Sequence, residues 1–77
     1  EPLFREALAM RRATLPAGHP DIAVSLSNLA VILQVQGKFS EAEPLQREAI
    51  EILRASLPAA HPDIAVSLSN LAFILQA

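Results

Sequence analysis

The stretch HPDIAVSLSNLA occupies His19–Ala30 and returns, letter for letter, at His61–Ala72. The similarity extends outward from it: residues 1–35 align without a gap on residues 43–77, and 26 of these 35 positions are identical. A period of 42 residues is typical of stacked repeat arrays, in which each repeat buries its apolar face only against its neighbours. We therefore expect a single repeat array over residues 1–77, with a long surface left uncovered.

The composition is that of a small apolar chain. Of its 77 residues, 52% are hydrophobic and 18% are charged, and the mean hydropathy is +0.35. No apolar run reaches the roughly 20 residues that cross a bilayer, so no membrane partner is expected. The six basic residues are dispersed and the net charge is −2, which argues against binding to nucleic acid. The absence of cysteine excludes disulfides and thiolate metal sites and fits a reducing compartment, so we expect a cytoplasmic location.

Four helices are predicted, over residues 1–13, 20–36, 40–55 and 62–77. Apolar residues recur in each at helical spacing, and no segment alternates in the manner of a strand. Pro20 and Pro62 fit the first helical position, where the missing N–H costs nothing. Residues 15–18 and Leu57-Pro58 break the pattern between helices. The fold is therefore predicted to be all-α.

Two signals mark the turn between the second and third predicted helices. Gly37 follows the second helix and permits the left-handed conformation that ends many helices. Ser40 and Glu43 have the spacing of a capping box, in which each side chain bonds the backbone N–H of the other residue. We therefore expect the third helix to open at Ser40.

The same region carries a family motif, consisting of Leu26-x-x-Leu29-Ala30-x-x-Leu33 followed by Gly37, Ala42 and Ala49. This pattern resembles a tetratricopeptide repeat. The 42-residue period and the segments HPDIA, SNLA, QGKF and EAEPL are similar to the variety found in kinesin light chains. Gln46 departs from the pattern, which has a large apolar residue there, and Ser27 and Ser69 replace the usual asparagine. The resemblance implies a right-handed superhelical solenoid of antiparallel helix pairs that holds a partner's peptide segment in a concave groove.

A helical wheel divides the second predicted helix into two stripes. Leu26, Leu29, Ala30 and Leu33 fall within about 80° of Ile22 and form the expected core seam. The opposite stripe is expected to line the groove, although extra packing between helices is an alternative for it. The predicted partner-binding residues are Val24, Ser27, Asn28, Val31 and Gln34 and, one period later, Val66, Ser69, Asn70, Phe73 and Gln76. For the two asparagines, a hydrogen bond to a neighbouring helix backbone is an alternative to ligand contact.

The predicted groove is almost uncharged. Asp21 and Asp63 begin the second and fourth helices, and neither helix carries Lys or Arg, so a clamp for a partner's terminal carboxylate is absent. Apolar patches with amide and hydroxyl groups favour a short hydrophobic or amphipathic peptide. The other two helices carry basic residues that we expect on a solvated convex face, with glutamate partners such as Glu51 for Arg47. These basic residues are Arg5, Arg11, Arg12, Arg47 and Arg54.

Catalysis and metal binding receive little support. His19 and His61, each in a His-Pro-Asp sequence, offer two ligand types, but no third ligand follows nearby. We interpret the motif as a cap that shapes each helix start. No serine lies in a recognisable histidine–carboxylate arrangement, and no glycine-rich phosphate loop is present. The chain is therefore expected to be non-catalytic, with no metal or cofactor and a protein or peptide as its partner.

The two ends of the chain support a second hypothesis. The pattern opens inside a helix without an initiator methionine, and polar capping repeats are missing, which indicates a piece of a longer array. The seven residues equivalent to Gln36–Ala42 would complete two full periods. Chains could therefore associate head to tail, or exchange helices into closed dimers, through their terminal helices. A regulatory array within a larger signalling protein is a further alternative.

Overall fold

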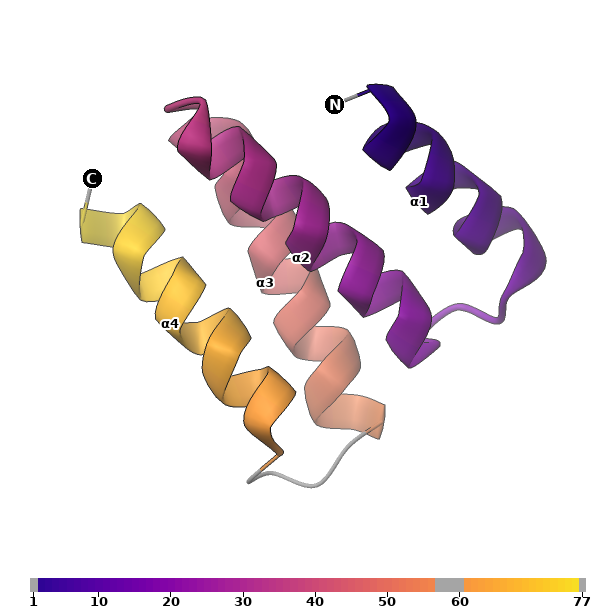
Figure 1. Cartoon of the computed structure of the whole chain (residues 1–77). Coiled ribbons are helices and arrows are strands. Elements are labelled where there is room, and N and C mark those ends of the chain that lie inside the picture. Colours follow the sequence, from indigo (N-terminus) through magenta and orange to yellow (C-terminus); the bar gives the residue numbers. More distant parts are fainter. Residues whose placement is uncertain (1, 57–60, 77) are drawn as a thin grey trace.

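A computed structural model describes residues 2–56 and 61–76 of the chain. The described residues form helices α1 (Pro2–Thr14), α2 (Pro20–Val35), α3 (Phe39–Ser56) and α4 (Pro62–Gln76), without strands. Consecutive helices run antiparallel, and α3 lies behind α2 and α4 (Figure 1). The all-α prediction is confirmed, and the arrangement is that of stacked helix pairs.

The helix boundaries agree with the sequence-based ones to within one residue where both ends are described. The structure ends α2 at Val35, with Gln36 as its cap, and extends α1 to Thr14. The predicted outer ends at Glu1 and Ala77 lie outside the described residues, as does the predicted break at Leu57-Pro58. No helix among the described residues is both long enough and apolar enough to cross a membrane.

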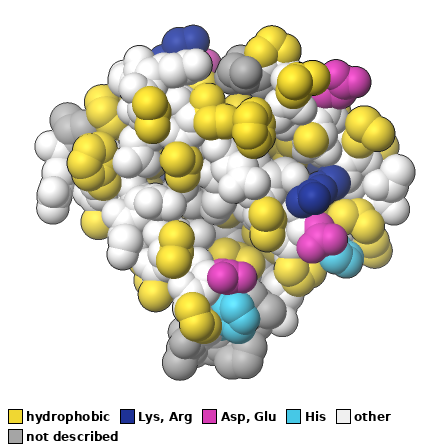
Figure 2. Space-filling view, in the orientation of Figure 1, with side chains coloured by type: hydrophobic (Ala, Val, Ile, Leu, Met, Phe, Trp, Pro, Cys, Tyr) yellow, Lys and Arg dark blue, Asp and Glu magenta, His cyan; other side chains and the backbone are white. Residues whose placement is uncertain are grey.

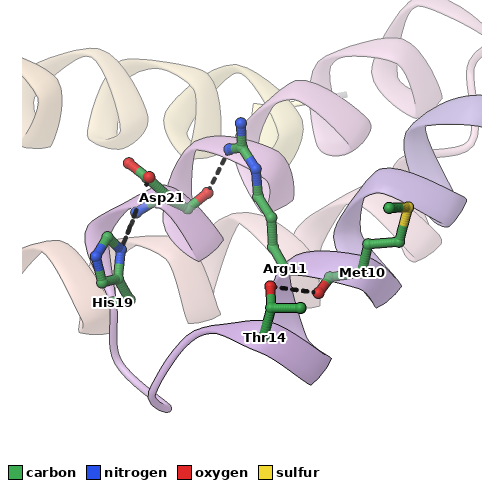
Figure 3. Close-up of polar contacts among 5 residues, drawn as sticks. All are labelled: Met10, Arg11, Thr14, His19 and Asp21. Carbon is green, nitrogen blue, oxygen red and sulfur yellow. Dashed lines mark hydrogen bonds and ion pairs between the residues drawn. The ribbon is translucent and has the colours of Figure 1, made fainter.

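Each His-Pro-Asp sequence caps the helix that it opens. His19 has an extended backbone, and its Nδ1 accepts a hydrogen bond of 3.1 Å from the Asp21 backbone N–H (Figure 3). His61 accepts the equivalent bond from Asp63 at the start of α4, also at 3.1 Å. These bonds satisfy one of the N–H groups that lack a partner in the first turn of a helix. The capping interpretation of the motif therefore agrees with the structure.

The turn between α2 and α3 is closed by backbone bonds around Gly37. Its φ of +78° is left-handed, its N–H bonds the Gln34 carbonyl, and the Lys38 N–H bonds the Leu33 carbonyl at 2.8 Å. This pair of bonds is a Schellman motif. The predicted capping box is wrong, because α3 begins at Phe39 and the Lys38 carbonyl accepts the first helical bonds. Phe39 packs against the core, which favours a helix start ahead of Ser40.

The core lies between α2 and its two neighbours. The predicted seam on α2 is almost fully buried, and it meets Leu8 of α1, Leu53 of α3 and Ile64 of α4 in one cluster. Because α2 has helices on more than one side, it contributes more buried residues than any other described helix, whereas α1 contributes only Leu8. The buried apolar residues of α2 are Ile22, Ala23, Leu26, Leu29, Ala30 and Leu33.

A partly buried polar contact joins three helices beside this core. Gln46 of α3 is fully buried, and its Oε1 accepts a 2.8 Å hydrogen bond from the Ser27 hydroxyl of α2. The Ser27 hydroxyl also lies 3.2 Å from that of Ser67 in α4. The Gln46 Nε2 is buried without a hydrogen-bond partner. The residue that departs from the repeat pattern therefore links α3 to α2 through its side-chain carbonyl oxygen, and the Ser27–Ser67 contact extends the link to α4.

Charged side chains connect the helices outside the core. Arg12 of α1 makes two hydrogen bonds of 2.8 and 2.9 Å to the Glu48 carboxylate of α3. The expected partner of Arg47 is corrected, because Arg47 pairs with Glu43 at 2.9 Å instead of with Glu51. Arg11 also differs from the expectation of a solvated face. Its guanidinium donates to the Asp21 carbonyl at 2.8 Å and so attaches α1 to the first turn of α2 (Figure 3).

Candidate functional site

One face of α2 and α4 exposes large apolar side chains. Val24 and Val31 of α2 and Val66 and Phe73 of α4 are between 38% and 59% exposed. On this side of the molecule, hydrophobic side chains spread across α2 and α4, and the few charged ones lie towards the lower end, the right-hand side and the upper rim (Figure 2). All four residues belong to the stripe that the helical wheel places opposite the core seam.

A hollow lies between α2 and α4 on this face. It has a volume of about 170 Å³ and is lined mainly by apolar atoms. This is smaller than the roughly 300–1,000 Å³ of small-molecule pockets, and it suits a single side chain better than a cofactor. We call it the α2–α4 hollow; it is lined by Ala23, Val24, Ser27, Asn28, Leu53, Asp63, Val66 and Ser67.

Four of the predicted partner-binding residues meet at the α2–α4 hollow. They are Val24, Ser27 and Asn28 from α2 and Val66 from α4. In the described residues (2–56 and 61–76), the side-chain amide of Asn28 makes no hydrogen bond, and neither does that of Asn70. The alternative role for these asparagines, a bond to a neighbouring helix backbone, is therefore not observed there. The exposed Asn28 amide is available to a ligand.

Ser27 and Gln34 lie closer to the neighbouring helices than the other predicted residues of α2. Both are only partly exposed. The Ser27 hydroxyl donates a hydrogen bond to Gln46 and lies within hydrogen-bond distance of the Ser67 hydroxyl. The Gln34 Oε1 is buried without a hydrogen-bond partner. Both residues occupy the edge of the stripe nearest the core seam, about 120–140° from Ile22 on the wheel. At this edge of the stripe, the side chains pack between helices, which is the alternative to lining the groove.

The remaining predicted residues lie outside the hollow. Phe73 packs against Phe39 of α3, with ring centroids 6.4 Å apart and ring planes inclined by 47°. Such a tilted aromatic pair stabilises the contact between α3 and α4. Ser69 and Gln76 are exposed and Asn70 is partly exposed on α4, and Val31 lies along α2 away from the hollow. The structure thus divides the predicted stripe into a hollow and a flanking apolar surface.

Sequence reasoning missed four residues that line the hollow, namely Ala23, Leu53, Asp63 and Ser67. Leu53 comes from α3, and nothing local in the sequence shows that this helix reaches the space between α2 and α4. Ser67 lies on the core side of its helix wheel, so it was not assigned to the groove. Asp63 is the one charged residue of α4, and nothing in the sequence alone shows that it reaches the hollow. Its carboxylate places a negative charge at one end of the hollow.

The chemistry available at this face is that of binding. Apolar walls exclude water from a small side chain, the Asn28 amide offers a donor and an acceptor, and the Asp63 carboxylate attracts a cation. In residues 2–56 and 61–76, no three His, Cys, Asp or Glu side chains gather where they could hold a metal ion.

Comparison with known proteins identifies the architecture. A sequence profile described as "Tetratricopeptide repeat" matches residues 1–21 and 22–63, which together cover most of the chain. The chain belongs to the tetratricopeptide repeat family. A search for curated relatives finds no match. Tetratricopeptide repeats are in general scaffolds for protein–protein interaction, and this coarse function is the one that family membership gives the chain.

Family membership clarifies the roles of the four helices. In tetratricopeptide terms, α2 and α4 are the first helices of two successive repeats, and α1 and α3 are second helices. The exposed apolar stripe and the hollow therefore belong to equivalent helices of adjacent tetratricopeptide repeats. Gln46 departs from the family pattern at a position that is fully buried, where its amide finds a partner in Ser27 of the adjacent first helix.

Proposed function

We propose that this tetratricopeptide array binds an apolar peptide segment of a partner protein on the face formed by α2 and α4. The α2–α4 hollow is the observation that carries the proposal, because it combines apolar walls, an unengaged amide at Asn28 and an acidic edge at Asp63. The 42-residue spacing of the repeats supports the further proposal that they are of the kinesin light chain variety.

The shape and charge of the hollow define the peptide that would fit. Its small volume accepts one aliphatic side chain, which the exposed methyl groups of Val24 and Val66 would shield from water. The Asn28 amide would bond the peptide backbone beside that side chain. The Asp63 carboxylate disfavours a carboxylate in the ligand and favours a Lys or Arg a few residues from the aliphatic anchor. Large ligands with several charged groups would find no partners here.

The rest of the stripe would extend the contact along α2 and α4. Val31 and Phe73 are exposed on the same pair of helices and add apolar area beyond the hollow. The Phe73 ring packs against the Phe39 ring, and this contact restricts its conformations before a ligand binds. Less conformational entropy is lost on binding when the contact residues are already held in place.

A peptide-array screen with the purified chain tests the proposal directly. We expect saturable binding to peptides that carry an aliphatic residue with Lys or Arg nearby. For the best peptide, Val66→Asp should weaken binding at least tenfold in a calorimetric titration, because a carboxylate would enter the apolar wall of the hollow. Tenfold corresponds to about 1.4 kcal/mol of binding free energy.

Ala9→Asp is a matched control for this test. Ala9 is exposed on α1 and takes no part in the lining of the hollow, so the same added charge should leave affinity unchanged. Circular dichroism of both variants verifies that helical content is retained. Equal affinity for the wild-type chain and Val66→Asp, or an equal loss in both variants, would contradict binding at this face.

A further inference from the structure

The same sequence is buried in α2 and uncovered in α4. Leu26 and Leu33 are fully buried in α2, whereas their repeat equivalents Leu68 and Leu75 are 39% and 55% exposed in α4. Ala30 has no exposed surface, and its equivalent Ala72 is exposed. The difference arises because α3 packs along this face of α2 and no described helix does so on α4. The free face of α4 therefore has the residues of a surface that accepts a helix like α3.

Helix α1 presents the complementary face. Its sequence is similar to that of α3 at the 42-residue spacing, and Ala7 is the equivalent of Ala49, which has no exposed surface in α3. Ala7 and Leu3 are exposed in α1, as is much of Phe4. Helix α1 thus has the apolar surface with which α3 packs on α2, and nothing in the described part of the chain covers it.

Charges match across the same two faces. Within the chain, Arg12 of α1 makes its bidentate contact with Glu48 of α3. The repeat equivalent of Arg12 is Arg54, and the residue that corresponds to Glu48 on α1 is Glu6. Both Arg54 and Glu6 are exposed, and neither takes part in an ion pair within residues 2–56 and 61–76. Each is therefore available to the other across a junction between two copies.

We propose that a second copy of this chain docks its α1 onto α4 and α3 of the first, in the way that α3 docks onto α2 and α1 within one copy. Arg54 of the first copy then pairs with Glu6 of the second, and Ala72 and Ala7 lie at the buried centre of the junction. The contact is head to tail, so each chain uses its α1 face towards one neighbour and its α4 face towards another. Association of this kind continues into open chains of molecules and does not stop at a dimer.

Differences between α1 and α3 make the junction chemically different from the internal interface. Arg11 takes the place of the buried core residue Leu53, and Leu8 takes that of Ile50. Gln46 faces Ser27 inside the chain, whereas Phe4 takes the place of Gln46 at the junction and Ser69 that of Ser27. A phenylalanine leaves no buried amide without a partner, which is the condition of the Gln46 Nε2. At this position the junction therefore lacks the unpartnered amide of the contact that it copies.

Sedimentation velocity on the 77-residue chain tests the proposal. The average mass of the wild-type chain should rise continuously with concentration. Ala72→Arg should abolish this growth, because its counterpart Ala30 is fully buried and leaves no room for a larger side chain. Ala7→Arg should do the same from the opposite face. Both residues are exposed in a single copy, so the substitutions leave its core intact. A wild-type chain that stays monomeric at millimolar concentration overturns the proposal.

Mixing the two blocked variants distinguishes head-to-tail docking from a symmetric contact. Ala7→Arg keeps a free α4 face and Ala72→Arg keeps a free α1 face, so the mixture should form one junction and stop at a heterodimer. Association of either variant alone would show a symmetric interface or exchanged helices and would refute the proposal. Absence of a heterodimer, when the wild-type chain associates, would refute it equally.

Two further variants provide the controls. Ala9→Arg should associate like the wild-type chain, because its counterpart Glu51 remains exposed when α3 is docked. Glu6→Arg should weaken association roughly fivefold, the upper range for an exposed ion pair, and adding Arg54→Glu should restore it by exchanging the charges. Val66→Asp should leave association unchanged, since its counterpart Val24 stays exposed in the packed repeat. Failure of peptide binding and failure of self-association can therefore be told apart.

Discussion

At the scale of single residues, Gln46 shows how a polar side chain is accommodated beside the core. Its Oε1 has a partner in Ser27, while its Nε2 is buried and has none. A hydrogen bond between buried groups contributes only about 0.5–1.5 kcal/mol net, whereas a buried group without a partner costs about 1–3 kcal/mol. The stability of this site therefore depends more on avoiding unpaired atoms than on making the bond.

This asymmetry leads to a prediction for the Ser27–Gln46 pair. Ser27→Ala should lower the free energy of unfolding by about 1–3 kcal/mol, because both amide atoms of Gln46 would then lack partners. Adding Gln46→Leu should recover the loss, since the amide is removed together with its partner. Urea denaturation measures both effects. Ser69→Ala is the control at the equivalent position, where the exposed serine should change stability by less than about 0.5 kcal/mol.

At the scale of helices, the starts and ends are specified by residues within a few positions of each other. His19 caps α2 and His61 caps α4 through the same backbone bond to the aspartate two residues later. Gly37 ends α2 with a positive φ, and a Cβ built there would meet nothing within 4 Å, so its role is conformational and not one of close packing. Such local signals explain why the helix boundaries could be predicted closely.

The cap at α2 can be tested by substitution. His19→Ala removes the acceptor of the Asp21 N–H and should lower the free energy of unfolding by about 0.5–2 kcal/mol in chemical denaturation. His19→Asn keeps a side-chain acceptor at the cap and should retain most of the stability. If the alanine and asparagine variants were equally destabilised, the imidazole would act through contacts other than the capping bond.

At the scale of the whole molecule, the position of a helix in the array decides what its side chains do. The motif shared by α2 and α4 is buried by neighbours in the first case and half uncovered in the second. The Arg12–Glu48 and Arg5–Glu41 pairs join α1 to α3, two helices of adjacent repeats. These pairs are solvent-exposed, so they contribute little stability and serve mainly to align the two helices.

Because α2 and α4 differ in burial, the same Leu→Ala substitution should lower the free energy of unfolding by different amounts in the two helices. Leu26→Ala should destabilise the fold by about 2–5 kcal/mol, because a fully buried leucine leaves a cavity. Leu68→Ala should cost much less in dilute solution, since the leucine is 39% exposed. Thermal unfolding at low protein concentration measures both. Equal costs would mean that α4 is covered as completely as α2.

Much of the architecture is determined by the sequence alone. The His-Pro-Asp caps and Gly37 mark helix boundaries because each acts within one turn of the chain, and the 42-residue period shows that the same pair of helices recurs. The exposed part of the stripe, including Val24 and Val66, also follows from helical periodicity. The exception is the start of α3, where packing of Phe39 overrode the local spacing of Ser40 and Glu43.

Only the tertiary structure decided which residues of different helices meet. It placed Leu53 and Asp63 at the α2–α4 hollow, joined Ser27 to Gln46 and Ser67, and paired Arg12 with Glu48. The physical reason is that these contacts depend on how far one helix is shifted and rotated against another. Packing of whole helix faces sets that arrangement, and identical residues in α2 and α4 therefore differ in burial.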